Sequence, residues 1–244
     1  MQLVKGKGVV LIHGAGLGAF IWQEMKLDWQ VLRINFQNRG NGPMNVGLHY
    51  QDYVDEVIQQ IENWTVDQIV IVGHSIGGCI ALNVAARYPE RVIGFIGISA
   101  AIPKKGGSFI SCFSGPKNWM LPLMMRIFGT KPPKFVLETN LCNGLKSEDR
   151  EKIVSRFTYE SRQLYLEDCN GSIPNCPKMY ILTTEDREFD PNDQKKMAKN
   201  LKTKQIERIE TGHLPMLADP KKLSYLINSF CKNLLAPPVK QAEK

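Results

Sequence analysis

Short runs of apolar, largely β-branched residues recur along the chain at intervals that suit buried strands. The run over residues 69–72, Ile-Val-Ile-Val, is apolar at every position, and this pattern favours a strand that is covered on both faces. Similar runs predict five further strands, over residues 8–12, 31–35, 91–98, 178–182 and about 205–209.

Stretches with helical spacing separate these runs. Residues 50–62 carry apolar side chains on one helix face, at Tyr53, Val54, Val57, Ile58 and Ile61. Further helices are predicted over residues 20–25, 79–86 and 192–201. A closing helix is predicted to begin at Asp219, with its carboxylate as the N-cap and Pro220 in the first turn. Strands that alternate with helices predict a parallel sheet with right-handed crossovers.

The alternation breaks between residues 102 and 177. This stretch has several prolines, no clear strand, and helix-like pieces over residues 118–128 and 147–166. We expect it to form a helical cap, inserted into an α/β core made of residues 1–101 and 178–244. The apolar centre of this cap includes Trp119 and Met124, which either pack the cap on the core or line an apolar substrate pocket.

Composition and charge exclude several classes of protein. The 244 residues are 43% hydrophobic and 23% charged, as in ordinary globular proteins. The net charge of +7 could indicate a nucleic-acid or membrane partner. The lysines are scattered, however, and no basic run alternates with aromatic residues. We therefore expect a solvated surface and no nucleic-acid partner.

The cysteines and the N-terminus indicate a cytoplasmic protein. The six cysteines show no C-x-x-C spacing and no pairing with histidine that would suit zinc. The chain enters a strand directly after MQLVKGKG, which leaves no room for a signal peptide. No apolar run approaches the ~18 residues of a membrane span. We expect free thiols in a reducing compartment and no metal site.

The sequence Gly73-His74-Ser75-Ile76-Gly77 matches the G-x-S-x-G pattern. An expected strand precedes it and an expected helix follows it, which is the context of a nucleophile elbow. Glycines let the strand and helix close tightly around a serine in a strained conformation. We therefore predict that Ser75 is a catalytic nucleophile. The alternative is a glycine-rich turn that happens to contain a serine.

A second small-residue turn, His13-Gly14-Ala15-Gly16, follows the first expected strand. At the carboxyl end of a parallel strand, such a turn can point backbone N–H groups into an active-site crevice. We assign the two oxyanion-hole donors to the N–H groups of Ala15 and Ile76. We interpret His13 as a packing residue.

A serine hydroxyl needs an adjacent base, which is usually histidine because its pKa lies near neutral pH. The chain has four histidines. His213 lies in a glycine loop after the last expected strand, where site residues gather, and we predict that it is the base. The other three are less suited: His74 points into the fold, His13 lies in the oxyanion turn, and His49 has no strand before it.

The third member of a triad is an acid, which this order of elements places between the serine and the histidine. Asp186 follows the penultimate expected strand, 27 residues before His213. Its role would be to hold the imidazole in the tautomer that accepts the serine proton. The alternatives are Glu185 and Asp190 in the same loop, then Asp193 at a helix start and Asp168 at the end of the cap.

These motifs together resemble the α/β-hydrolase superfamily. The matching elements are the turn at residues 13–16, the Gly-His-Ser-Ile-Gly-Gly run, the loop at residues 185–187, and the Gly212-His213 loop with its downstream Asp-Pro. The short length is similar to the small esterase branch, which includes plant methylesterases, hydroxynitrile lyases, bacterial carboxylesterases and acylglycerol lipases. The resemblance implies an α/β-hydrolase fold with a mainly parallel sheet of about six strands, flanked by helices.

The chain departs from that branch at two places. Family members commonly carry Asp and Ser at the positions of Gln37 and Pro43, so we expect the loop after the second strand to differ in shape from theirs. Hydroxynitrile lyases of this type carry a lysine directly after the histidine, where this chain has Leu214. The second departure disfavours a lyase.

The expected function is that of a serine carboxylesterase acting through an acyl-enzyme on small or medium apolar esters, without metal or cofactor. The residues expected to contact the substrate are Gly14, His74, Trp119, Met124 and Leu214. A homodimer is compatible with this function. Two alternatives remain open: a lyase or C–C bond hydrolase on the same scaffold, and a ligand-sensing binding protein that turns over slowly.

Overall fold

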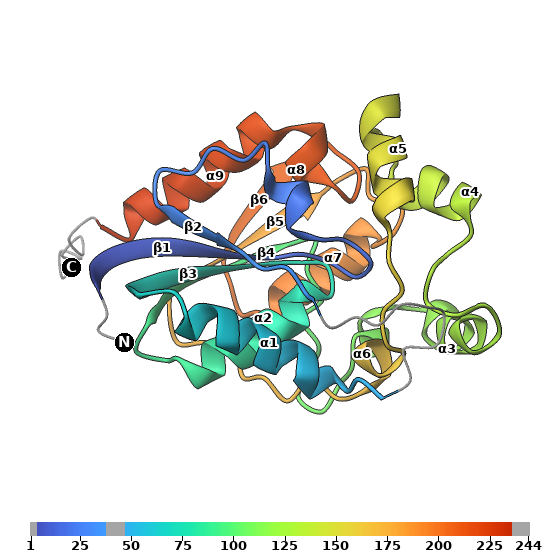
Figure 1. Ribbon diagram of the computed structural model, residues 1–244, viewed down its shortest axis with the longest axis horizontal. Helices are drawn as coiled ribbons and strands as arrows, with labels where there is room; N and C mark the ends of the chain where they lie inside the picture. Colours follow the sequence, from blue (N-terminus) through green and yellow to red (C-terminus); the bar gives the residue numbers. More distant parts are fainter. Residues whose placement is uncertain (1–3, 38–46, 236–244) are drawn as a thin grey trace, which may run out of the picture.

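The computed structural model describes residues 4–37 and 47–235, and within them a six-stranded sheet forms the centre of the molecule (Figure 1). Every pair of neighbouring strands is parallel. In spatial order the strands are β2 (Gln30–Arg33), β1 (Val4–Ile12), β3 (Val66–His74), β4 (Val92–Ile98), β5 (Lys178–Thr183) and β6 (Gln205–Ile209). This confirms the predicted α/β fold with about six parallel strands.

Successive residues of the central strands face opposite sides of the sheet. In β1, Val10 and Ile12 belong to one hydrophobic core, whereas Val9 and Leu11 belong to the other. Both cores are closed by helices, so both sets of side chains are buried. This explains why the strands are apolar throughout and do not alternate with polar residues.

Helices cover both faces of the sheet (Figure 1). The face of Val10 and Ile12 is covered by α1 (Tyr50–Glu62), α2 (Gly77–Arg87) and α7 (Pro191–Asn200). The other face is covered by the 3₁₀ helix η1 (Ala19–Trp22), α8 (Pro215–Ala218) and α9 (Pro220–Asn233). Asp219 caps α9, as predicted, because its side chain accepts a hydrogen bond from the Lys222 N–H.

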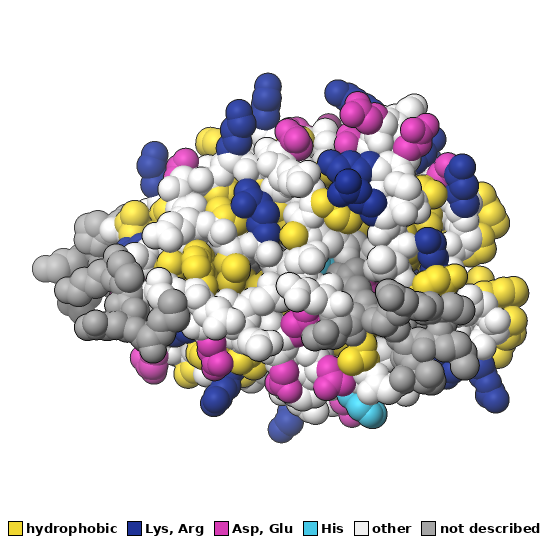
Figure 2. Space-filling model, viewed as in Figure 1, with side chains coloured by type: hydrophobic (Ala, Val, Ile, Leu, Met, Phe, Trp, Pro, Cys, Tyr) yellow, Lys and Arg dark blue, Asp and Glu magenta, His cyan; other side chains and the backbone are white. Residues whose placement is uncertain are grey.

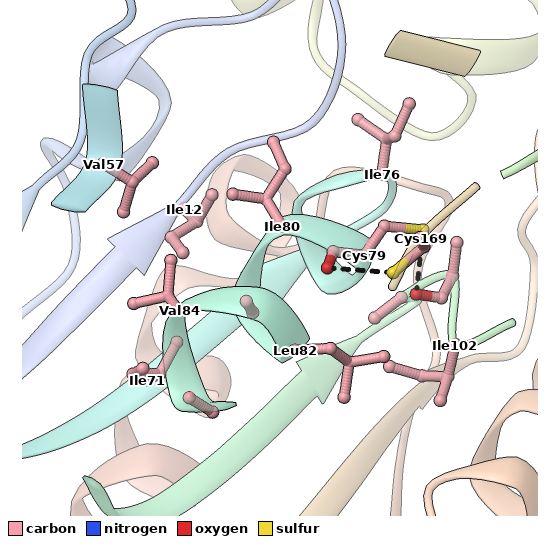
Figure 3. Close-up of a cluster of buried hydrophobic side chains, with 14 of the residues drawn as sticks. Ile12, Val57, Ile71, Ile76, Cys79, Ile80, Leu82, Val84, Ile102 and Cys169 are labelled. Atoms are coloured by element: carbon pink, nitrogen blue, oxygen red, sulfur yellow. Dashed lines mark hydrogen bonds between the residues drawn. The ribbon is translucent and has the colours of Figure 1, made fainter. Parts of the chain in front are cut away.

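The first turns of α2 are deeply buried (Figure 3). Ile76 and Ile80 pack in the core beside Ile12. The Cys79 thiol donates to the Ala101 carbonyl at 3.5 Å, and the Cys169 thiol donates to the Cys79 carbonyl at 3.3 Å. All six cysteines are free thiols. Packing and hydrogen bonds therefore hold the start of α2 in place, and with it the turn that contains Ser75.

Residues 102–177 lie between β4 and β5 in the chain and contribute no strand to the sheet. Their helices gather at one end of the molecule, beyond the sheet (Figure 1). In chain order the helical elements are η2 (Ile110–Cys112), α3 (Lys117–Phe128), α4 (Lys134–Val136), η3 (Leu137–Leu141), α5 (Ser147–Arg156) and α6 (Gln163–Leu166).

The structure corrects the helix predicted over residues 147–166, which is divided into α5 and α6. Between them the chain docks on the turn after β1. The Thr158 N–H donates to the Gly16 carbonyl at 3.0 Å, and the Glu160 carboxylate accepts from the Gly16 N–H at 2.9 Å. Gly16 has a φ of 71°, and a Cβ there would lie 2.1 Å from the Phe157 ring, so only glycine fits under this contact.

Other differences concern the ends of elements. The first strand begins earlier than predicted, at Val4, and a 3₁₀ turn replaces the helix predicted over residues 20–25. The expected glycine turn after β2, beyond Gln37, and the C-terminal tail over residues 236–244 lie outside the described residues. In the described parts of the chain, none of the helices is long and apolar enough to cross a membrane.

Candidate active site

Ser75 lies at the sharp turn between β3 and α2. Its φ of 54° is in the left-handed region, which a non-glycine residue adopts at a cost. The flanking glycines allow this turn to close. A Cβ at Gly73 would lie 2.7 Å from the Gly77 carbonyl oxygen, and one at Gly77 would lie 2.7 Å from the Ile12 carbonyl oxygen. The strand, strained serine and helix thus have the geometry of a nucleophile elbow.

Backbone hydrogen bonds hold this turn. The Ser75 N–H donates to the Ile98 carbonyl at 3.2 Å, and the Ser75 carbonyl accepts from Ala101 at 2.9 Å. The N–H groups of Ala15 and Ile76 have no hydrogen-bond partner within the described residues. Two such groups beside an exposed oxygen of a substrate could stabilise a developing negative charge.

His213 follows β6 and pairs with Asp186, which follows β5. The Nδ1 atom of His213 lies 2.7 Å from Oδ2 of Asp186, and both side chains are almost fully buried. Burial acts to lower the pKa of His213, but the charge and hydrogen bond of Asp186, together with the charge of Glu188, raise it above its usual value. The imidazole is therefore oriented with Nδ1 on the carboxylate, which leaves Nε2 for another partner.

Six hydrogen bonds hold the Asp186 carboxylate. Oδ1 accepts from two backbone N–H groups, those of Glu188 and Phe189. The donors to Oδ2, besides His213, are Ser99, Thr183 and Gln194, at 2.6, 2.8 and 3.2 Å. Burial acts to raise the pKa of Asp186, but the charge and hydrogen bond of His213, followed by the Phe189 N–H and the Ser99 hydroxyl, hold it well below the usual range.

Ser99, Thr183 and Gln194 are site residues that the sequence predictions missed. Ser99 directly follows β4. It has a φ of 41°, and its hydroxyl donates to Asp186 and lies 3.3 Å from Nδ1 of His213. A polar residue directly after an apolar strand, as Ser99 is, could have indicated this position, because the carboxyl ends of parallel strands face the site.

The other acids considered for the triad lie elsewhere. Glu185 is exposed, and Asp190 caps α7 by accepting from the Asn192 N–H at 2.7 Å. Asp193 pairs with Lys196 at 3.0 Å, and Asp168 is exposed. Of these carboxylates, only Asp186 hydrogen-bonds His213.

The other three histidines pack or hydrogen-bond within the fold and do not hydrogen-bond Asp186. His74 is fully buried, and its Nε2 donates to the His213 carbonyl at 2.8 Å. Burial, followed by the proximity of His213, lowers the pKa of His74 to about 3, so it is neutral near pH 7. His13 is buried with its ring edge on Phe36, and His49 caps α1 on the surface beside Glu167. His74 therefore supports the loop of His213 and does not line the cavity, contrary to its assignment as a substrate contact.

A cavity of about 140 Å³ opens beside Ser75 and His213. Gly14 and Ala15 from the turn after β1 line it as well. Residues 102–177 supply most of the wall, which is largely apolar: Phe109, Phe113, Leu121, Met125, Thr130, Pro132, Leu137, Leu141, Phe157 and Tyr165. The structure thus brings the proposed nucleophile, base and oxyanion turn to one apolar cavity.

Three residues expected to contact the substrate do not line this cavity. Trp119 and Met124 lie on the outer side of α3, with 63% and 44% of their surfaces exposed. Leu214 is fully buried in the core beneath the site. In α3, residues four apart share a face, so Leu121 and Met125 reach the cavity where Trp119 and Met124 cannot.

Glu188 places a carboxyl group in the cavity wall. Burial is the main cause of its raised pKa, which the His213 charge partly opposes. Among the described residues no ion pair holds this carboxylate. In the same part of the chain, no cluster of three or more histidine, cysteine, aspartate or glutamate side chains could hold a metal ion.

Comparisons with known proteins place the chain in a family. Residues 9–224 match the model of the alpha/beta hydrolase family. Polyneuridine aldehyde esterase from Rauvolfia serpentina is 24% identical, covering 94% of both chains. Salicylic acid-binding protein 2 from Nicotiana tabacum is 25% identical over 90% of this chain and 95% of its own.

A solved structure supports the same fold. An extracellular alpha/beta-hydrolase from a Paenibacillus species superposes with a TM-score of 0.79 at 19% identity, covering 91% of this chain and 98% of its own. The family model spans most of the chain, from β1 into α9. This protein therefore belongs to the alpha/beta hydrolase family.

Proposed function

We propose that this protein is a serine esterase, with Ser75, His213 and Asp186 as its catalytic triad. The observation that carries the proposal is the shared cavity: Ser75 at a strained strand-to-helix turn and His213, oriented by Asp186, line the same apolar space. The names of its relatives agree with this activity, since they include polyneuridine aldehyde esterase and several putative methylesterases from Arabidopsis thaliana.

In the proposed mechanism, the Ser75 hydroxyl attacks the ester carbonyl while Nε2 of His213 takes its proton. The N–H groups of Ala15 and Ile76 stabilise the tetrahedral oxyanion, each contributing roughly 10²–10³ in rate. His213 then gives the proton to the leaving alcohol, and an acyl-enzyme remains on Ser75. Water, activated by the same imidazole, releases the acid.

We propose that residues 102–177 act as a cap that selects the substrate, and that residues 1–101 and 178–244 form the catalytic core. The cap supplies ten of the cavity-lining residues, nearly all of them apolar. A volume of about 140 Å³ is close to that of cavities that admit a benzene-sized ligand. The favoured substrates are therefore small apolar esters, for which no cofactor is required.

The cavity wall favours an esterase over a lyase. The position after His213 holds Leu214, which is buried in the core, and no lysine of the described residues lines the cavity. The site therefore lacks the cation that the resemblance associates with hydroxynitrile lyases.

A series of p-nitrophenyl esters, from acetate to decanoate, tests the proposed activity. We expect hydrolysis of the short esters and a decline toward decanoate, because a long acyl chain exceeds the cavity. A fluorophosphonate is expected to label Ser75, as detected by mass spectrometry of the modified peptide. Failure of all the esters, together with failure of labelling, would contradict the proposed esterase.

Replacing Glu188 with glutamine tests the electrostatics of the base. The Glu188 charge helps to raise the pKa of His213, so its removal should lower that pKa. The imidazole acts as a base only when neutral, and the acidic limb of the pH profile of kcat/KM should therefore move to lower pH.

The matched control is Glu185→Gln, which removes the same charge from an exposed position in the same loop. Its acidic limb should stay at the wild-type position. An unchanged limb in Glu188→Gln, or a shift toward higher pH, would contradict the proposal that the Glu188 charge raises the pKa of His213.

A further inference from the structure

Most side chains of helix α3 are exposed, and none is fully buried. We use the name α3–α4 surface for the exposed apolar residues of α3 together with Phe135 of α4. They are Trp119, Met120, Leu123, Met124, Ile127, Phe128 and Phe135. Trp119, Ile127 and Phe128 each expose more than 60% of their surface. Hydrophobic side chains are visible at this end of the molecule, with basic side chains around them (Figure 2).

This surface is unusual because α3 is apolar on both sides. Leu121 and Met125 line the cavity on the inner side, and the α3–α4 surface covers the outer side. A helix that is apolar all round is normally buried, either in a protein core or in lipid. Large apolar patches on a soluble protein mark interaction sites. We therefore expect the outer side of α3 to be covered by a partner.

The segment of the chain that carries this surface has charges of one sign. No aspartate or glutamate occurs between residues 92 and 137. The same stretch contains six basic residues: Lys104, Lys105, Lys117, Arg126, Lys131 and Lys134. The nearest acid along the chain, Glu138, lies 3.8 Å from the Lys134 ammonium in an exposed pair, which contributes little. The segment of the chain that carries the α3–α4 surface is thus basic, with Lys117, Arg126 and Lys134 inside the two helices themselves.

We propose that the α3–α4 surface binds an anionic lipid surface, with the apolar side chains inserted at the interface and the basic residues on the lipid headgroups. Tryptophan and phenylalanine with flanking lysine and arginine are the composition of helices that lie in such interfaces. Each basic residue near an anionic leaflet contributes about 1 kcal/mol. Docking in this way would set α3, the outer wall of the cavity, directly against the lipid.

A second copy of the chain fits this surface less well. A two-fold interface between identical subunits places the same patch on both sides. It would bring the basic residues of α3 and α4, which are Lys117, Arg126 and Lys134, close to their copies in the other subunit, and this repulsion opposes association. An anionic lipid surface supplies the opposite charge.

Vesicle flotation of the purified protein tests the proposal without any turnover. We expect binding to vesicles of phosphatidylcholine mixed with phosphatidylserine, weaker binding to phosphatidylcholine alone, and loss of the difference at high salt. The variant Ile127→Ser with Phe128→Ser should weaken binding to the mixed vesicles by at least about tenfold, since insertion scales with buried apolar area.

The control variant carries Ile206→Ser and Tyr225→Ser, two substitutions at exposed apolar residues of β6 and α9. It should bind lipid like the wild type. Equal binding by both variants, or no binding by the wild type, would overturn the proposal. So would a wild-type dimer, measured by light scattering, that Ile127→Ser with Phe128→Ser dissociates, because a second copy would then cover the surface. Lipid binding in a protein that hydrolyses no ester would support this inference and contradict only the proposed activity.

Discussion

Replacing Ser75 with alanine is expected to lower kcat for ester hydrolysis by about 10⁴–10⁶-fold. The substitution removes the only atom that can form the acyl-enzyme and leaves the cavity, the oxyanion donors and the His213–Asp186 pair in place. Substrate binding should therefore persist while chemistry is lost. Steady-state hydrolysis of p-nitrophenyl acetate measures the loss, and the affinity for a non-hydrolysable ester analogue measures what is retained.

Ser99→Ala is the matched control for this substitution. Both serines end a central strand and have positive φ values, so the strain cost of alanine is similar at the two positions. The Ser99 hydroxyl, however, lies on Asp186 and near Nδ1 of His213, on the side of the imidazole away from the proposed reaction. Ser99→Ala removes one of several hydrogen bonds to Asp186 and should cost about tenfold. Equal losses in the two variants would contradict Ser75 as the nucleophile.

The sequence predicted well those parts of the fold in which one physical requirement determines the residue pattern. Strands such as β3 are apolar at every position because both faces are buried, and this pattern is visible without a structure. The turn around Ser75 was predictable because its glycines are needed for close approach. The cytoplasmic location and the homodimer stay predictions from the sequence.

The parts that could not be predicted depend on contacts between distant segments. α5 ends at Arg156 because the following residues dock on Gly16, about 140 positions earlier in the chain, and no local signal reveals this contact. The sequence also does not indicate which side of α3 faces the cavity, because apolar residues occur on both sides of this helix. Gln194 reaches Asp186 only through the packing of α7 on β5.

Replacing Asp186 with asparagine is expected to lower kcat by about 10⁴-fold, which corresponds to about 5.4 kcal/mol in the activation barrier. The carboxylate accepts hydrogen bonds at both oxygens, from backbone N–H groups at Oδ1 and from side chains at Oδ2. An asparagine side chain has one oxygen and one NH₂ group. In either of its two orientations, the NH₂ group would face N–H or O–H donors and could not accept their hydrogen bonds. At Oδ2 it would also turn the tautomer of His213, so that Nε2 carries the proton and cannot accept one from Ser75.

Two further variants separate this role from the other acids of the same loop. Asp190→Ala removes the N-cap of α7 and should cost about 1 kcal/mol of stability, while the activity of the folded enzyme stays at the wild-type level. Glu185→Gln should change neither property, since that side chain is exposed. Urea unfolding and kcat measured on all three variants distinguish the effects. A large loss of kcat in Asp190→Ala, with Asp186→Asn still active, would indicate that Asp190 and not Asp186 is the acid of the triad. Asp186 is the expected site because its carboxylate hydrogen-bonds His213 from a buried position, whereas the Asp190 carboxylate caps a helix.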